Sequence, residues 1–320
     1  MKIVILDRST LGYDTPLNKI EELGDVYCYD NTSENEISER INDADVIIVN
    51  KIKITREIIK EAKKLRLICV FATGYDNIDT RAAAEYSVGV CNVPGYSTQS
   101  VALFTVATVL SLVTHLREYN RYVTSGEYSK SSSANRLTPV YNEIYGKTWG
   151  VIGYGNIGRA VGDVARSLGA KVIVNKRHND PLCECVSVDE LCRRSDIITI
   201  HCPLNNETRS MINDDRIALM KNNVIIVNSA RGAVVSEEGI ARALIEGRIG
   251  AFGSDVYSIE PFGNDHPYIK IMERDNVILT PHCAWGAYEA RERCAVIIAD
   301  NIKAYFDNKI LNRVDIPRQS

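Results

Sequence analysis

Short runs of aliphatic and β-branched residues alternate along the chain with segments that carry helix-start signals. Each run is apolar throughout, which is the pattern of strands buried on both faces of a parallel sheet. Helix starts are indicated by Thr15 before Pro16, by Thr55, and by Ser236, whose following acids suit the positive end of a helix dipole. The pattern predicts an α/β protein with helices on both faces of its sheets. The predicted strands are Lys2–Leu6, Val46–Val49, Leu67–Phe71, Val88–Cys91, Trp149–Ile152, Lys171–Val174, Ile197–Ile200, Val224–Val227, Ala251–Ser254 and Val277–Leu279.

One stretch, from Arg117 to Lys147, breaks this alternation. It is polar, and a connection of this length is usually functional or interfacial. Its tyrosines, if exposed, favour a contact between subunits. The alternative is a long surface arm that only connects two domains. A length of 320 residues suggests that the chain has two domains. The tyrosines are Tyr119, Tyr122, Tyr128, Tyr141 and Tyr145.

The charge balance and the length of the apolar segments argue against two classes of partner, nucleic acids and membranes. Lys and Arg number 38 against 41 Asp and Glu, so we expect no broad basic face and no nucleic-acid partner. The start, Met1–Leu6, resembles a first strand rather than a signal peptide. The longest nearly apolar stretch, Val101–Val113, is too short to cross a bilayer, and Thr105 and Thr108 within it fit a buried packing helix. We therefore expect no membrane partner.

The nine cysteines are odd in number and scattered along the chain. This favours a reducing, cytoplasmic location in which the thiols act as small apolar residues. Cys183, Cys185, Cys192 and His201 can be considered as metal ligands, but their spacing matches no common zinc pattern. No metal is expected.

A glycine-rich turn follows the predicted strand Trp149–Ile152 and precedes a predicted helix. Gly153, Gly155 and Gly158 form the pattern G-x-G-x-x-G in the strand–turn–helix context that dinucleotide binding requires. The first glycine permits the tight turn, the second lets a pyrophosphate approach the backbone, and the third lets helix and strand pack closely. The pyrophosphate then lies at the helix N-terminus. The alternative, a plain glycine turn, is much less favoured in this context.

The end of the next predicted strand bears on the choice of coenzyme. An Asp or Glu there would bond the ribose 2′-hydroxyl of NAD, but the sequence has Asn175, Lys176 and Arg177. Two fixed positive charges would attract the 2′-phosphate of NADP. We therefore expect NADP(H) to be accepted and favoured over NAD(H). The alternative is a solvated basic turn, with NAD held by other contacts.

Three residues of complementary chemistry follow predicted strands late in the chain. Arg231, Glu260 and His282 lie after the carboxyl ends of strands, where open α/β sheets bind ligands. A guanidinium can hold a carboxylate and polarise a neighbouring carbonyl, and an imidazolium can protonate the developing alkoxide while an acid orients the ring. Taken singly, each is compatible with a plain structural role, such as a surface cation or a packed loop histidine. Downstream of a dinucleotide motif, the three together suggest reduction of a 2-keto acid.

These motifs, in this order, resemble those of the D-isomer-specific 2-hydroxy acid dehydrogenases over nearly the whole chain. They are the glycine motif, Asn228-Ser-Ala-Arg231-Gly232, Gly253-Ser-Asp255-Val256, Glu260-Pro261 and Thr280-Pro-His282. Within that family the chain is most similar to the glycerate dehydrogenases, also called hydroxypyruvate reductases. The residues that carry this closer similarity are Asn50-Lys51, Ala72–Tyr75, Asn92–Thr98 and Trp285.

The resemblance implies two Rossmann-like, doubly wound parallel-sheet domains with the active site in the cleft between them. Residues 1–99 plus 289–320 would form the substrate domain, and residues 100–288 the dinucleotide-binding domain. Arg231 would be the substrate carboxylate anchor and electrophile, His282 the acid/base and Glu260 its partner, and the long arm would form a homodimer contact. The other implied contacts are backbone N–H groups of Thr73 and Gly74 to substrate, Asp255 to the nicotinamide carboxamide, and Asn156, Ile157, Cys202, Ser229 and Ala230 to the cofactor.

The sequence therefore predicts an NAD(P)-dependent reductase of small 2-keto acids, with hydroxypyruvate and glyoxylate as leading substrates. Lys51 is a candidate cation beside the substrate, or else a solvated loop lysine. The alternatives are a reductase of lactate-like or branched 2-keto acids, a phosphoglycerate dehydrogenase, disfavoured because no C-terminal regulatory extension is present, and a non-catalytic dinucleotide-sensing corepressor. The sequence departs from the family at Lys176, where NAD-dependent members usually have Asp. It departs again at Leu103-Phe104, which replaces a more usual polar pair. We expect this change to affect either the packing near the cleft or a contact with a partner.

Overall fold

The computed structural model describes residues 1–177 and 183–316. The chain forms two compact units, of which the first contains residues 1–97 and the segment from residue 286 onward, and the second contains Thr98–Trp285. The sequence places the corresponding boundaries after residues 99 and 288. Which unit binds substrate and which binds the nucleotide stays a prediction.

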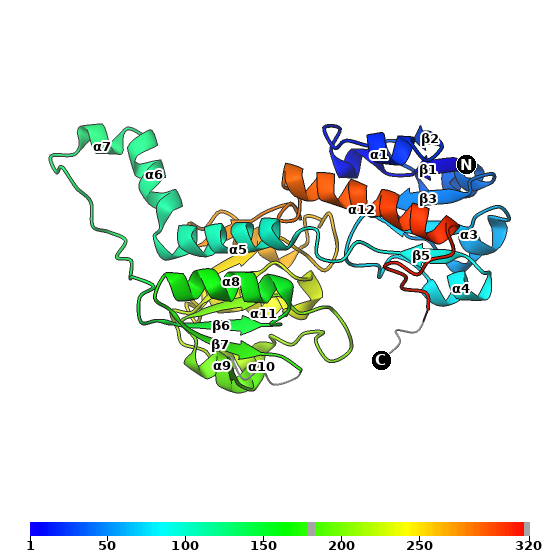
Figure 1. Cartoon of the computed structure of the whole chain (residues 1–320). Helices are drawn as coiled ribbons and strands as arrows, with labels where there is room; N and C mark the ends of the chain where they lie inside the picture. Colours follow the sequence, from blue (N-terminus) through cyan, green and yellow to red (C-terminus); the bar gives the residue numbers. More distant parts are fainter. Residues whose placement is uncertain (178–182, 317–320) are drawn as a thin grey trace. The chain divides into compact units, whose positions relative to one another are not determined.

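The first unit contains a five-stranded parallel sheet with the strand order β2-β1-β3-β4-β5. Figure 1 labels β1, β2, β3 and β5 of this sheet. The order reverses between β1 and β3, and loops at such a switch point are where open α/β sheets bind ligands. The strands are β1 (Lys2–Ile5), β2 (Asp25–Cys28), β3 (Val46–Val49), β4 (Leu67–Val70) and β5 (Gly89–Cys91). The helices are α1 (Asn18–Glu21), α2 (Ile37–Ile41), α3 (Arg56–Glu61), α4 (Thr80–Glu85) and α12 (Tyr288–Phe306).

Helices cover both faces of this sheet, as buried strands require. The side chains of α2, α3 and α4 form one apolar core with the sheet, while α12 packs against β4 and α1. Strands β3 and β4 are fully buried, which is why they appear in the sequence as unbroken aliphatic runs.

The second unit contains a seven-stranded parallel sheet with the order β12-β11-β10-β9-β6-β7-β8. The strands are β6 (Thr148–Ile152), β7 (Lys171–Asn175), β8 (Glu184–Cys185), β9 (Ile197–Ile200), β10 (Ile225–Asn228), β11 (Ala251–Ser254) and β12 (Val277–Leu279). The helices are α5 (Thr98–Val113), α6 (Leu116–Thr124), α7 (Glu127–Lys130), α8 (Asn156–Ser167), α9 (Val188–Arg194), α10 (Asp214–Leu219) and α11 (Glu237–Ile245).

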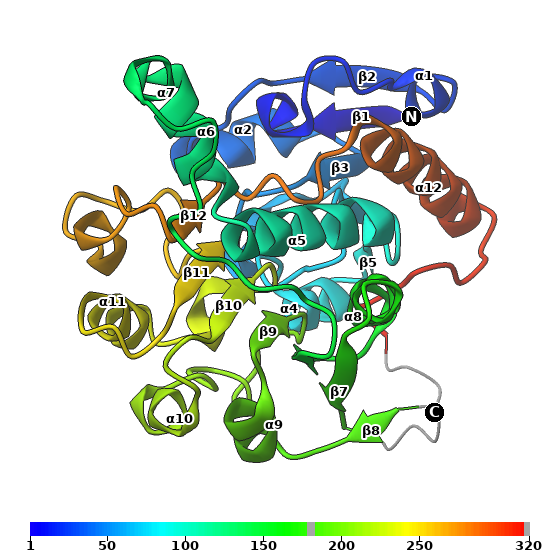
Figure 2. The same ribbon diagram turned by 90° about the vertical axis from the view of Figure 1, so that its left-hand side faces the viewer.

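Two apolar cores lie on opposite faces of this sheet (Figure 2). Helices α5 and α8 contribute to one core, and helices α9, α10 and α11 contribute to the other. Trp149 is fully buried at the start of β6, and its indole N–H donates to Thr199 Oγ1 over 3.1 Å, so its polar group is satisfied in the interior. The two parallel sheets with helical layers confirm the predicted fold class of two Rossmann-like domains.

Besides shifts of one residue at the ends of several strands, the structure differs from the sequence-based expectation in the following elements. Strands β2 and β8 were not anticipated, because neither has a buried apolar run. Thr15 does not begin a helix: its hydroxyl donates to the Leu11 carbonyl, and α1 starts only at Asn18. The stretch Arg117–Lys147 is not a plain loop, because it contains most of α6 and all of α7.

Within the described ranges, no single helix is long and apolar enough to cross a membrane, whereas α5 and α6 taken together pass that test with a bend of 66° between them. In the same ranges, no group of three or more His, Cys, Asp or Glu side chains could hold a metal ion.

Candidate active site

The glycine-rich turn connects β6 to α8 in the second unit, and each glycine meets a different steric demand. Gly153 has φ +86°, and a Cβ there would lie 2.5 Å from the Cys202 backbone nitrogen. A Cβ on Gly158 would lie 2.2 Å from the Gly153 carbonyl oxygen. A Cβ on Gly155 would meet no protein atom within 4 Å. The protein thus requires glycine at 153 and 158 for its own packing, while the space beside Gly155 is free for a ligand.

Helix α8 begins at Asn156, directly after Gly155, which has no side chain to cap it. Backbone N–H groups in a first helical turn lack intrahelical partners, and the helix dipole adds positive potential there. This end of α8 therefore fits an anionic group such as the pyrophosphate of a dinucleotide, with Asn156 and Ile157 as the first amides to meet it.

The predicted cofactor residues on the neighbouring strands also lie at the carboxyl edge of the sheet. Lys176 and Arg177 follow β7, and Arg177 forms an exposed ion pair of 3.3 Å with Glu207. Cys202 follows β9, and burial raises the pKa of its thiol to about 11. The thiol is therefore neutral near pH 7 and packs as a small apolar group.

Two further predicted cofactor residues, Ser229 and Ala230, directly follow β10. The Ser229 hydroxyl is 2.9 Å from Thr105 Oγ1 on α5 and 3.3 Å from His201 Nδ1. Burial lowers the pKa of His201 to about 3, so this imidazole is neutral at physiological pH. His201 was considered in the sequence only as a metal ligand, and the structure places it instead as a hydrogen-bond partner of a predicted cofactor residue.

The three predicted catalytic residues come from the loops after three adjacent strands. In the parallel ladder, Asn228 on β10 pairs with Ser254 on β11, and Ser254 pairs with Leu279 on β12. Arg231 and His282 each follow their strand end by three residues, and Glu260 follows by six. The register therefore brings all three loops to the same edge of one sheet.

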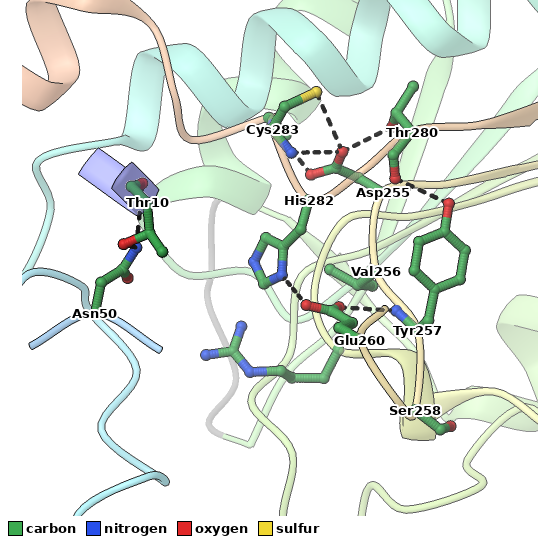
Figure 3. Close-up of polar contacts among 12 residues, drawn as sticks. Thr10, Asn50, Asp255, Val256, Tyr257, Ser258, Glu260, Thr280, His282 and Cys283 are labelled. Atoms are coloured by element: carbon green, nitrogen blue, oxygen red, sulfur yellow. Dashed lines mark hydrogen bonds and ion pairs between the residues drawn. The ribbon is translucent and has the colours of Figure 1, made fainter. Parts of the chain in front are cut away.

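His282 and Glu260 form a direct contact at this edge (Figure 3). His282 Nδ1 lies 2.6 Å from Glu260 Oε2, and both side chains are about one-quarter exposed, at 23% and 28%. The other oxygen of Glu260 accepts the Tyr257 N–H over 3.0 Å. Because a carboxylate can only accept a hydrogen bond, the Nδ1 atom carries a proton, and this contact restrains the orientation of the ring.

Asp255 holds the loop that carries His282. Its carboxylate, only 4% exposed, accepts the N–H groups of Cys283 over 2.9 Å and Ala284 over 2.8 Å, and the Thr280 hydroxyl over 2.7 Å. These bonds lie on both sides of His282, so the imidazole is carried by a segment with little freedom (Figure 3). The implied contact of Asp255 with the nicotinamide stays a prediction.

Arg231 lies in a turn that is also held on both sides. The buried Asn228 side chain donates to the Arg231 carbonyl over 3.0 Å and accepts the Ala230 N–H over 3.1 Å. A Cβ on Gly232 would lie 2.0 Å from the Tyr257 carbonyl carbon, so the turn packs directly against the loop that leads to Glu260. The half-buried Arg231 side chain donates to the Ala230 carbonyl over 2.8 Å.

Several of these positioning residues had no role assigned from the sequence. Asn228, Gly232 and Thr280 belong to the recognised motifs, and their positions in those motifs were the available signal. Tyr257 gave no such signal. Its hydroxyl donates to the Thr280 carbonyl over 2.9 Å, and burial raises its pKa above the usual value, so it remains a neutral donor linking the two loops.

The predicted substrate residues of the first unit lie after adjacent strands of its sheet. Lys51 follows β3 and is exposed, and its N–H donates over 2.6 Å to Asp7, which follows β1. Burial raises the pKa of Asp7, although its bonds from the Lys51 and Asn50 amides act in the opposite direction. Thr73 and Gly74 follow β4, with the Thr73 hydroxyl donating to Val93 O over 2.8 Å. These contacts define the loops, and the role of the three residues towards substrate stays a prediction.

Comparison with known proteins agrees with this geometry. Residues 106–284 match the family model described as "D-isomer specific 2-hydroxyacid dehydrogenase, NAD binding domain". The chain is 36% identical to a hydroxypyruvate reductase of Blautia hydrogenotrophica over 98% of this chain and 100% of that protein. It is 34% identical to a glyoxylate reductase of Thermococcus onnurineus over 87% and 86% of the two chains. The crystal structure of D-lactate dehydrogenase from Aquifex aeolicus, complexed with NAD and lactic acid, superposes with a TM-score of 0.87 at 29% identity, covering 99% and 100% of the chains.

The fold and these similarities define a nicotinamide-dependent oxidoreductase acting between 2-hydroxy acids and 2-keto acids. The chain belongs to the D-isomer-specific 2-hydroxyacid dehydrogenase family. The predicted family and enzyme class are thereby confirmed, and none of these findings supports the corepressor alternative.

Because the environments of Gly155 and Gly158 differ, the same substitution should affect nucleotide binding at Gly155 and stability at Gly158. Gly158→Ala should lower the free energy of unfolding by about 1–3 kcal/mol, because its Cβ overlaps the Gly153 carbonyl. Gly155→Ala should leave the melting temperature nearly unchanged but weaken nucleotide binding, because its Cβ fills the space left for the ligand. Thermal melts and NAD(P)H fluorescence titrations check both, and unaltered nucleotide affinity in Gly155→Ala would contradict this account of the turn.

Proposed function

We propose that the enzyme reduces hydroxypyruvate or glyoxylate to the corresponding 2-hydroxy acid, with Arg231, Glu260 and His282 as its catalytic residues. The observation that carries the proposal is the 2.6 Å contact between His282 Nδ1 and Glu260 Oε2, at the sheet edge where Arg231 also lies. A histidine whose Nδ1 proton is held by a carboxylate has a fixed ring orientation and a defined site of proton exchange.

Each catalytic residue then has one task. Arg231 holds the substrate carboxylate through two parallel hydrogen bonds and polarises the adjacent carbonyl. His282 gives a proton from Nε2 to the oxygen of that carbonyl, and Glu260 stabilises the charged ring beforehand. The nicotinamide, when bound, supplies the hydride that reduces the carbonyl carbon. We assign nucleotide binding to the second unit and propose that Lys51, Thr73 and Gly74 bind substrate from the first.

The names of the relatives support hydroxypyruvate or glyoxylate as the substrate, and the site residues are compatible with both. The curated relatives above are named for hydroxypyruvate and glyoxylate, and the chain matches nearly the full length of the first of them. The similar solved structure contains lactic acid, so a lactate-like substrate is the second candidate. Both classes require the same Arg231 and His282 chemistry, and they differ only in the group attached to the keto carbon.

Activity measurements should separate these possibilities. Hydroxypyruvate, glyoxylate, pyruvate and a branched 2-keto acid would each be tested with NADH and NADPH at the nicotinamide absorbance. We expect the highest kcat/KM with hydroxypyruvate or glyoxylate. His282→Ala should lower kcat by about 10²–10⁴-fold, the usual contribution of general acid catalysis.

His115→Asn is the matched control, because His115 has φ +50°, which Asn tolerates, and lies at the junction of α5 and α6. It should retain wild-type turnover. Near-full activity in His282→Ala, with the nucleotide still bound, would refute the assignment. A higher kcat/KM with pyruvate would favour the lactate-like alternative.

We further propose that NADP(H) is preferred over NAD(H). Lys176 and Arg177 directly follow β7, whose last residue, Asn175, accepts the Gly153 N–H over 2.9 Å. That bond connects the end of β7 to the turn expected to hold the pyrophosphate. The Arg177–Glu207 pair is largely exposed, so it holds Arg177 only weakly against a competing phosphate.

Neutralising Lys176 tests this coenzyme preference. Lys176→Gln should lower kcat/KM for NADPH by about 10–100-fold, the effect of losing a charged hydrogen bond of about 1.5–3 kcal/mol, and should change NADH much less. Lys171→Gln, at the opposite end of β7, is the control and should alter neither value. A wild-type enzyme that strongly prefers NADH would overturn the proposal.

We also propose that the enzyme is a homodimer joined through the arm that follows α5. Helix α6 has no buried residue, and it projects with α7 away from the sheet of the second unit (Figure 1). Leu137, Val140 and Tyr145 on the same arm are each about three-quarters exposed, at 76%, 74% and 78%. Leu103 on α5 is 71% exposed, which favours a partner contact over internal packing as the reason for this departure from the family. So much apolar surface is typical of a subunit interface.

Charged substitutions on the arm test the dimer. The wild-type enzyme should have about twice the 35.7 kDa mass of one chain in analytical ultracentrifugation. Leu137→Glu combined with Val140→Glu should give the single-chain mass, because two charges cannot be buried without partners. Ile245→Glu places a charge on an exposed apolar residue of α11 and should leave the dimer intact. A wild-type enzyme that sediments as a single chain would refute the dimer.

A further inference from the structure

A second carboxylate, that of Glu237, reaches the loop that carries Glu260. Glu237 is the first residue of α11, and its side chain is only 12% exposed. Its Oε1 atom accepts the Ser258 N–H over 2.9 Å, and its Oε2 atom lies 3.2 Å from His266 Nε2. Burial of a carboxylate is costly, so these contacts must offset a substantial loss of hydration.

His266 is fixed by its other contacts. Its Nδ1 atom accepts the Tyr268 N–H over 3.2 Å and so caps the short 3-10 helix Pro267–Lys270. Its ring stacks on Phe262 with centroids 4.5 Å apart. Because Nδ1 accepts a hydrogen bond, the single proton of the neutral ring is assigned to Nε2, the atom that faces Glu237. The 3.2 Å approach is not aligned as a full hydrogen bond, so the contact is mainly electrostatic.

Two carboxylates therefore hold consecutive backbone amides of one loop. Glu260 accepts the Tyr257 N–H over 3.0 Å, and Glu237 accepts the next N–H, that of Ser258. The peptide group between Tyr257 and Ser258 packs on Gly232, where no side chain could fit. The loop is thus restrained from the start of α11, from the Arg231 turn and from its own acid.

The position of Glu237 is not explained by helix capping alone. Ser236 already caps α11, because its hydroxyl oxygen accepts the Gly239 N–H over 3.1 Å. Glu238 also places an acid in the first turn, yet its side chain is exposed to solvent. Interaction with the helix dipole can therefore be satisfied without burial. Glu237 differs from its neighbour in turning inward to the Ser258 amide.

We propose that Glu237, supported by His266, is a positioning residue for the acid–base pair: by holding the Ser258 amide it fixes the loop from which Glu260 reaches His282. The inference rests on the proposed roles of Glu260 and His282. Loss of this restraint allows Glu260 to shift, and a displacement of about 1 Å in a catalytic site can cost about 10²-fold in rate.

A double-mutant cycle tests this coupling. Glu237→Ala should lower kcat by about 10–100-fold, while KM for the keto acid and the Kd for NADPH change by less than about threefold. In a Glu260→Gln background, the same substitution should cost less than about threefold in kcat, because the residue that it positions is already disabled. Glu238→Gln, the adjacent exposed acid, is the matched control and should keep wild-type kcat.

The outcomes are distinguishable. An equal loss in both backgrounds would show that Glu237 supports the fold generally, and wild-type kcat in folded Glu237→Ala would also overturn the inference. If Glu260→Gln itself left kcat unchanged, the proposed acid–base pair would fail first. Glu237→Gln keeps the side-chain volume and serves if the alanine variant does not fold. Its amide oxygen can still accept the Ser258 N–H, but the negative charge that faces His266 is lost, so a partial loss of kcat is expected.

Discussion

The in-register pairing of β10, β11 and β12 is the constraint on which the rest of the site depends. Parallel strands end at the same edge of a sheet, so the loops after Asn228, Ser254 and Leu279 start side by side although they are far apart in the chain. Each loop then needs to extend only three to six residues to present a side chain. A shift of one residue in any of the three strands would turn its side chains to the opposite face and separate the functional groups.

Two carboxylates, of the buried Asp255 and the partly exposed Glu260, then convert adjacent loops into a site of defined geometry. Asp255 accepts hydrogen bonds from the segment around His282, and Glu260 accepts from its own loop as well as contacting the imidazole. Hydrogen bonds from backbone N–H groups to a carboxylate are among the stronger polar contacts in proteins. The cost of burying the charge of Asp255 is offset by hydrogen bonds that also restrict the position of His282.

The predictability of the elements follows the degree of their burial. Strands β3, β9, β11 and β12 were predicted with the observed bounds. Strands β3 and β9 are buried throughout and nearly all aliphatic, which is typical of a strand covered on both faces. Strands β2 and β8 were missed because they carry polar residues and have no apolar run, whereas the other two edge strands, β5 and β12, have one and were predicted. No helix was predicted in the arm, because its sequence is polar and α6 has no buried residue.

For the site, local sequence was sufficient wherever the chemistry lies within one turn or one motif. The glycine pattern between β6 and α8 predicted the turn, since its three glycines lie within one strand–turn–helix segment, although the close approach of Gly153 to Cys202 is set by the tertiary packing of two strands. The nature of Arg231, Glu260 and His282 indicated the reaction. The contacts that hold the loops carrying these residues were decided only by tertiary structure. They are the contacts of Asp255 with Ala284, of Tyr257 with Thr280 and of Glu237 with Ser258, each of which joins separate segments of the chain. Such contacts arise from the packing of the whole sheet, and no local pattern of residues encodes them.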